Sequence, residues 1–71
     1  MKKVLFPNLE AELKKKGYTQ SAYGKAIGLT PSQVSYRLNG KIDFSLYEMT
    51  KTADLLDKTL DYLFRRKLKS L

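Results

Sequence analysis

The stretch IGLTPSQVSYRLNG, residues 27–40, decides the fold. Gly28 separates two segments in which apolar residues recur at helical spacing, so the stretch predicts two helices joined by a tight turn. The second helix has a complete start signal. Thr30 is its cap, Pro31 takes the first helical position, where its missing N–H does no harm, and Gln33 completes a capping box. The stretch is therefore predicted to be a helical hairpin. Its second helix could serve only to pack against the rest of the protein, or it could also present side chains to a partner.

Similar signals along the rest of the chain predict an all-α domain of five short helices. Ser45 and Glu48 form a second capping box, and Thr19 is placed to cap the helix before the glycine turn. Asp57 tolerates the left-handed conformation that a break between two helices requires. No strand pattern of comparable strength is present. The expected helices run over residues 7–16, 20–27 and 31–39, from the Ser45 cap to the Asp57 break, and from Thr59 to residue 64.

Apolar spacing assigns a buried face to each helix. Gly24 lies in the middle of the second helix, where it costs roughly 1 kcal/mol relative to alanine. This cost indicates that another helix approaches closely there, although a neutral glycine at a tolerant position is an alternative. The buried residues expected in the second helix are Ala22, Tyr23, Ala26 and Ile27, and those expected in the fourth are Leu46, Met49, Ala53 and Leu56.

Composition excludes several classes of function. The chain has 71 residues and lacks both cysteine and histidine, which removes disulfides, thiolate metal sites, the usual zinc ligand and the usual general base. We therefore expect no metal, no cofactor and no enzymatic activity, since so short a chain also encloses a substrate pocket with difficulty. One domain is expected over residues 1–71, with an N-terminal arm (1–6), a helical core (7–64) and a basic tail (65–71).

The positive charge is large and segregated. The net charge is +7 and the pI is about 9.8. Residues 1–42 have a net charge of +6, residues 43–64 a net charge of −3, and the tail from residue 65 adds +4. Such a balance favours a polyanionic partner, either nucleic acid or an acidic membrane surface, over a role in solubility alone.

A membrane-bound form is disfavoured by the apolar pattern. No apolar run approaches the roughly 18–20 residues that span a bilayer. The opening MKKVLF resembles a signal peptide, but Pro7, Asn8 and Glu10 cut its apolar stretch short. We expect a cytoplasmic protein with no membrane partner. The tail over residues 65–71 is short for a membrane-surface segment.

The third helix has an outward face of unusual chemistry. On a helical wheel Val34 and Leu38 define the core direction, and Tyr36 lies about 180° away with polar neighbours. Lys and Glu, which are common on solvated faces, are missing from this one, and short or planar hydrogen-bonding groups take their place. Such groups can contact base edges, although a face that contacts only water is an equally weighted alternative. The outward residues are Ser32, Gln33, Tyr36 and Asn39, with Arg37 on the flank.

Taken together, the motifs resemble the helix-turn-helix of the lambda/434 repressor and Cro family. The resemblance rests on the Thr19-Gln20 pair, the run GLT at residues 28–30, the run NGK at residues 39–41 and the run LDYL at residues 60–63. It covers about residues 8–64. The glycine turn alone is a weak motif, but the four elements together are specific. The resemblance implies a five-helix DNA-binding domain.

The resemblance also implies roles for individual residues. The start of the third helix carries base-reading side chains in this family, and the start of the second helix, the end of the third and the start of the fourth contact the DNA backbone. Helix N-termini favour phosphate in this way. The expected base contacts are Pro31, Ser32, Gln33 and Tyr36. The expected phosphate contacts are Gln20, Asn39, Lys41 and Ser45, to which the wheel adds Arg37.

Some positions depart from the family pattern. Gly24 stands where alanine is usual and Tyr23 where leucine is usual. Pro31 removes a side chain that reads bases in relatives, so specificity should depend on the residues after it. Arg37-Leu38 replaces the commoner order of an apolar residue followed by glutamate. The wheel places Leu38 in the core and leaves Arg37 available for phosphate.

The function expected from these observations is sequence-specific regulation of transcription. We expect a small Cro-like repressor that binds a pseudo-palindromic operator in double-stranded DNA as a homodimer, with the third helix in the major groove and no small-molecule ligand. A protein-interaction module on the same fold, such as an antitoxin or adaptor, is the alternative. The dimer surface is expected at Tyr62, Phe64 and Leu68 or at a strand over residues 3–6, unless these residues complete a monomer core.

Overall fold

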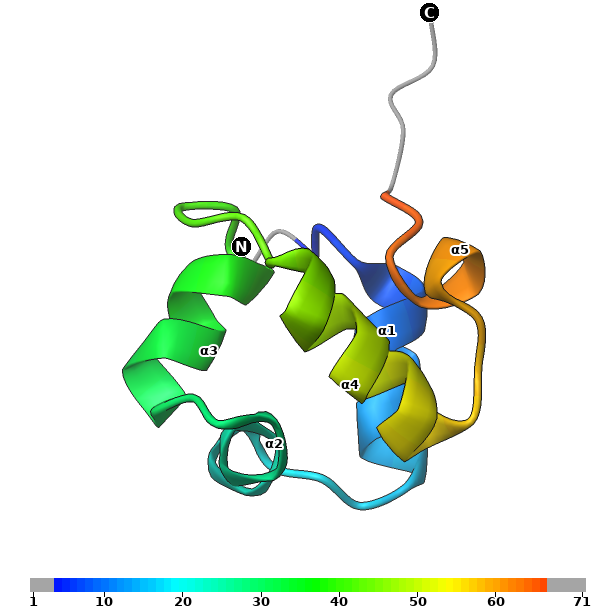
Figure 1. Cartoon of the computed structure of the whole chain (residues 1–71), viewed down its shortest axis with the longest axis horizontal. Helices are drawn as coiled ribbons and strands as arrows, with labels where there is room; N and C mark the ends of the chain where they lie inside the picture. The colour runs from blue at the N-terminus through cyan, green and yellow to red at the C-terminus, as the bar shows by residue number, and fades with distance from the viewer. Residues whose placement is uncertain (1–3, 67–71) are drawn as a thin grey trace, which may run out of the picture.

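The computed structural model describes residues 4–66 and contains five helices (Figure 1). No strand occurs among these residues, so the all-α fold class is confirmed. The predicted boundaries are also correct to within one or two residues. The helices are α1 (Pro7–Lys15), α2 (Gln20–Ile27), α3 (Pro31–Leu38), α4 (Leu46–Leu56) and α5 (Leu60–Leu63).

Hydroxyl caps fix the starts of four helices. In each case a Ser or Thr side chain accepts the backbone N–H three residues later, which typically contributes about 1 kcal/mol. Both predicted capping boxes are present, at α3 and at α4. Helix α1 lacks a side-chain cap and begins with Pro7 instead. The capping residues are Thr19, Thr30, Ser45 and Thr59.

Left-handed residues end the helices where the chain must turn. Gly28 closes α2 with a φ of 83°, and its N–H returns to the carbonyl of Gly24. Asp57 closes α4 with a φ of 54°, the one non-glycine residue with positive φ between residues 4 and 66. An aspartate tolerates this conformation better than most residues, as the sequence predicted.

Helix α3 lies at one side of the molecule, where it packs mainly against α2 (Figure 1). Helix α2 also contacts α4, and α5 packs against both α1 and α4. One face of α3 therefore faces away from the rest of the protein. The buried apolar residues form one cluster: Phe6, Leu9, Leu13, Tyr23, Ile27, Val34, Leu38, Leu56 and Leu63.

The buried faces of α2 and α4 differ from the predicted ones. Ala22 and Ala26 are exposed, and Gly24 is buried in their place. The reason is that α2 turns Tyr23 and Ile27 into the core, which moves the centre of the buried face away from both alanines. In α4, Leu46 is 68% exposed, whereas Met49 and Ala53 are half-buried and Leu56 is fully buried, as predicted.

The chain before α1 belongs to the core. Phe6, assigned by sequence to an arm, is buried and meets two other phenylalanine rings edge to face. Its ring centroid lies 5.7 Å from that of Phe44 and 5.8 Å from that of Phe64, and the last two lie 4.9 Å apart. Phe64 thus completes the core of the monomer, and residues 4–6 form no strand.

A buried hydroxyl pair joins α2 to α4. The Tyr23 hydroxyl lies 2.7 Å from Thr52 Oγ1, which in turn donates to the Glu48 carbonyl at 2.7 Å. Because Thr52 uses its proton on that carbonyl, Tyr23 is the donor of the first bond. A leucine at position 23 could not make this bond.

Gly24 allows α2 and α3 to meet. A Cβ at this position would lie 2.5 Å from the Leu29 carbonyl oxygen and 2.9 Å from Val34 Cγ2. Both distances are shorter than van der Waals contact, and the carbonyl belongs to the backbone, which yields less easily than a side chain. The close approach predicted from the mid-helix glycine is confirmed.

Gly24→Ala should therefore destabilise the protein. The clash should cost about 1–3 kcal/mol, as overpacked cores do, and the roughly 1 kcal/mol gain in helix propensity should offset part of that. The net loss in the free energy of unfolding, measured by urea titration, should be about 1 kcal/mol. Ser21→Ala, at an exposed position of the same helix, is the matched control and should change stability by less than about 0.5 kcal/mol.

Tyr23→Phe should have an effect on stability that reverses with pH. Burial raises the pKa of Tyr23 to about 12, aided by the negative charge of Glu48 and opposed by the Thr52 hydroxyl. Below pH 10 the variant should be less stable than the parent by about 1 kcal/mol, the value of one hydrogen bond. Between pH 10 and pH 12 the parent should lose about 2–3 kcal/mol, because only its folded state resists ionisation of Tyr23.

The measurement is the difference in unfolding free energy between the parent and Tyr23→Phe across this pH range. Taking the difference removes the titration of the other tyrosines and of the lysines. A constant difference from pH 8 to pH 12 would contradict the assignment of Tyr23 as a buried, neutral donor.

Candidate nucleic-acid interface

The outward face of α3 is confirmed by the packing. Val34 is fully buried and Leu38 is 4% exposed, so both tie the helix to the core. Tyr36, on the opposite side, is 43% exposed. The other residues predicted to contact bases are also at the surface: Pro31, Ser32 and Gln33.

Gln33 also has a role in starting α3. Its Oε1 accepts the Thr30 N–H at 2.9 Å, and its own N–H donates to Thr30 Oγ1 at 3.2 Å. The sequence predicted both a capping role and a base-reading role for this side chain. The capping role is confirmed, and it leaves the side-chain NH₂ as the group that can reach a partner.

The loop after α3 brings Lys41 over Tyr36. Gly40, with a φ of 80°, turns the chain so that the Lys41 N–H donates to the Tyr36 carbonyl at 2.9 Å. Lys41 Nζ then lies 5.8 Å from the centre of the Tyr36 ring. Asn39 is exposed and donates to Ser35 Oγ at 3.3 Å. A positive charge and an aromatic ring thus lie together at the end of the outward face.

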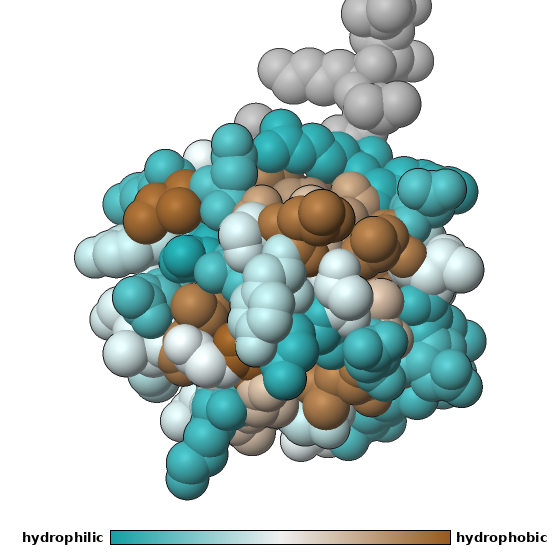
Figure 2. Space-filling model, in the orientation of Figure 1, coloured by the Kyte–Doolittle hydropathy of each residue, from teal (hydrophilic) through white to brown (hydrophobic). Residues whose placement is uncertain are grey.

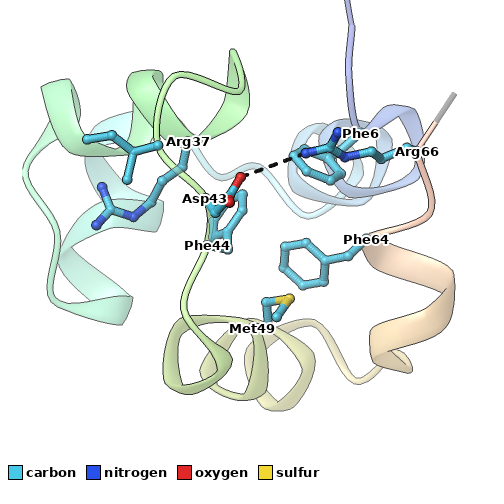
Figure 3. Close-up of a pocket in the computed structure, with 8 residues that line it drawn as sticks. Phe6, Arg37, Asp43, Phe44, Met49, Phe64 and Arg66 are labelled. Atoms are coloured by element: carbon cyan, nitrogen blue, oxygen red, sulfur yellow. Dashed lines mark ion pairs between the residues drawn. The ribbon is translucent and has the colours of Figure 1, made fainter.

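Arg37 is engaged within the protein, contrary to the expectation that it would be available for phosphate. Its Nε lies 2.8 Å from Glu48 Oε1, and its Nη1 donates to the Gln33 carbonyl at 3.0 Å. The side chains of Arg37 and Glu48 are only 13% and 12% exposed. Figure 3 shows Arg37 at the edge of a hollow whose lining includes Phe44 and Met49.

Glu48 carries the negative charge of this arrangement. Burial disfavours its ionised form, but hydrogen bonds from Arg37 and Ser45 and the charge of Arg37 outweigh that effect, and the pKa of the Glu48 carboxyl lies below its ordinary value. The carboxylate is therefore ionised at neutral pH. Sequence reasoning placed Glu48 only in the cap of α4 and did not find its pairing with Arg37.

Ser45 and Gln20 are placed differently from each other. The Ser45 N–H donates to Glu48 Oε1 at 3.0 Å, and its Oγ accepts the Glu48 N–H at 3.1 Å, so both groups serve the cap. Gln20 is exposed at the start of α2. It lines a groove together with Lys14, Tyr18 and other residues. The expected phosphate position at Gln20 is therefore accessible.

The rest of the surface is mixed. Figure 2 shows apolar side chains in separate groups within a largely polar face. Ile42, Leu46 and Tyr47, around the start of α4, are among the large exposed ones. Within residues 4–66, no group of three or more acidic side chains could hold a metal ion, and no helix is long and apolar enough to cross a bilayer.

Comparison with known proteins identifies the fold. A family model described as helix-turn-helix matches residues 9–63. The chain belongs to the helix-turn-helix family. Its α2, the turn at Gly28 and α3 are the elements that give this family its name, and the resemblance predicted from the sequence is confirmed.

A solved structure supports the same fold for the helix-turn-helix protein. The P22 c2 repressor, crystallised with a synthetic operator, is similar over 90% of this chain and 97% of its own, with a TM-score of 0.74 and 20% identity. At this identity the likeness concerns the fold alone. No curated protein sequence matches the chain significantly.

Gln33→Ala should reduce stability as well as any DNA discrimination. Loss of the side-chain half of the capping box should cost about 0.5–1 kcal/mol of unfolding free energy. Gln33→Glu is the control, because a glutamate at this position preserves the box. Thermal unfolding of the two variants checks the role. Equal stability of Gln33→Ala and the parent would show that the bond to Thr30 contributes nothing.

Proposed function

We propose that this helix-turn-helix protein is a sequence-specific, double-stranded DNA-binding regulator of transcription that places α3 in the major groove. The observation that carries the proposal is the outward face of α3. Val34 and Leu38 hold the helix on the core, while Ser32 and Tyr36 stay at the surface. The family match supports this use, since the second helix of the motif is the one that enters the groove.

Each residue of the outward face suits base reading for a different reason. Ser32 can donate or accept, the Gln33 NH₂ can donate to a base edge, and the Tyr36 hydroxyl can do either while its ring contacts a thymine methyl. Pro31 has no polar side-chain group and can offer only apolar contact. Specificity should therefore depend mainly on Ser32, Gln33 and Tyr36.

The phosphate contacts are proposed at both ends of the motif. Gln20 is exposed at the start of α2, and Asn39 and Lys41 follow α3, so these residues precede and follow the reading face along the chain. The net charge of +7 supports binding to a polyanion. Ser45 and Arg37 remain candidates only if they exchange bonds that they make within the protein.

A Cro-like mode of repression, with a homodimer on a pseudo-palindromic operator, remains part of the proposal. Of the dimer residues suggested by sequence, Phe64 is used in the core, and Leu68 lies outside the described residues. Tyr62 is 36% exposed, and its hydroxyl lies 3.4 Å from Glu12 Oε2. Tyr62 is thus the described candidate that keeps exposed surface for a second copy.

A protein-interaction module on the same fold is the second candidate. The exposed apolar residues Leu46 and Tyr47, at the start of α4, favour it. Such a module needs neither the outward face of α3 nor the positive charge beside it. An enzymatic role finds no support, since the family and the similar P22 c2 repressor are not enzymes.

DNA binding is tested by titrating random duplex DNA at several salt concentrations. The protein should bind at low salt, and its affinity should fall steeply as salt rises, because each phosphate contact releases counterions. Lys41→Ala should flatten the plot of log K against log salt by about 0.9. Lys58→Ala, which removes an exposed lysine from the acidic segment, should leave the slope unchanged.

Sequence specificity is tested by selection of bound duplexes from a random pool. A recovered site with two related half-sites about one helical turn apart would support the dimer. Absence of binding to any duplex at low salt would contradict the proposed function and favour the interaction module.

A further inference from the structure

An ion pair between Arg37 and Glu48 links the side chains of α3 and α4. Helix α3 packs chiefly on α2, and the loop from residue 39 to residue 45 separates it from α4 (Figure 1). Arg37, on α3, and Glu48, on α4, meet with Arg37 Nε 2.8 Å from Glu48 Oε1. The pair is therefore placed to control the angle between the two helices at the end of α3.

The link extends into the backbone on both sides. Glu48 Oε1 accepts the Ser45 N–H at 3.0 Å in addition to the Arg37 guanidinium. Arg37 Nη1 donates to the Gln33 carbonyl, one turn earlier in α3. One carboxylate oxygen thus joins the start of α4 to an arginine that is itself bound to the backbone of α3.

The environment of the pair differs from that of an ordinary surface ion pair. Both side chains are almost nine-tenths covered, so solvent and salt screen their attraction less than they screen exposed charges. Exposed pairs contribute little because they are hydrated and flexible. This pair has a charge-assisted bond, which is stronger and more directional than a neutral one.

The pair also determines where the Arg37 charge goes. On the helix surface Arg37 lies about 100° from Tyr36, and its guanidinium is bound to Glu48 of α4. An arginine held and neutralised in this way cannot also neutralise a DNA phosphate without leaving Glu48.

We infer that Glu48 is a positioning residue of the proposed DNA-reading surface. By binding Arg37, Glu48 keeps α3 in its orientation, and it also prevents Arg37 from contacting the phosphates. The inference rests on the proposed function. It replaces the role that the helical wheel assigned to Arg37, a phosphate contact, with a role inside the protein.

Arg37→Met tests whether Arg37 stays off the phosphates and whether its bond to α4 supports discrimination. Methionine keeps much of the aliphatic length and removes the charge and both hydrogen bonds. The salt slope for random duplex DNA should stay the same, because no phosphate contact is lost. Discrimination between the selected site and random DNA should fall by roughly tenfold, the value of about one base contact, since α3 loses its link to α4.

Glu48→Gln tests whether the Glu48 carboxylate is the group that keeps Arg37 from the phosphates. Glutamine preserves the capping box of α4 but no longer neutralises Arg37. The variant should bind random duplex DNA more tightly than the parent, with a salt slope steeper by up to about 0.9, while its discrimination falls. The matched control is Glu10→Gln, which removes the same charge from a residue that makes no ion pair among residues 4–66.

The outcomes separate this inference from the proposed function. A parent protein that does not bind DNA contradicts the proposed function itself. If the parent binds, a slope that flattens by about 0.9 in Arg37→Met identifies Arg37 as a phosphate contact and overturns the inference alone. Equal slopes for Glu48→Gln and Glu10→Gln also overturn it. If Arg37→Met does not fold, as judged by circular dichroism, the comparison of the two glutamate variants decides the question.

Discussion

The close contact of α2 with α3 at Gly24 is the constraint on which the rest of the structure depends. The Leu29 carbonyl oxygen and Val34 Cγ2 occupy space that a side chain at position 24 would need. Because the helices approach this closely, the Val34 side chain is completely buried in the core. Because α3 is anchored along this one side, its opposite side faces away from the protein, and the candidate DNA surface exists as a result.

Hydrogen bonds between side chains join α2 and α3 to α4, which the contact at Gly24 does not involve. Packing at Gly24 sets the distance between α2 and α3 near the start of α3. The Tyr23 hydroxyl fixes α2 to α4 through Thr52, and the pair of Arg37 with Glu48 fixes α3 to α4. Helices α2 and α3 are thus both bonded to the same short stretch of α4, at Thr52 and Glu48.

Much of the fold could be predicted from the sequence because its signals are local. Caps such as Thr30 act within three residues, and the wheel needs only the spacing of Val34 and Leu38. The failures involve contacts between distant segments. The pairing of Arg37 with Glu48 crosses a loop, and the rings of Phe6 and Phe64 meet from opposite ends of the chain. No periodicity within one helix indicates such partners, and the roles of the proposed DNA contacts remain predictions.

The capping role of Gln33 has a consequence for evolution of the proposed DNA-reading face. Its side chain closes the first turn of α3, so most replacements there would weaken the helix before any new base preference could be selected. Ser32 and Tyr36 make no such bond with their side chains among the described residues. If α3 reads DNA as proposed, substitutions that change base preference should therefore concentrate at these two positions, with position 33 restricted to glutamine or glutamate.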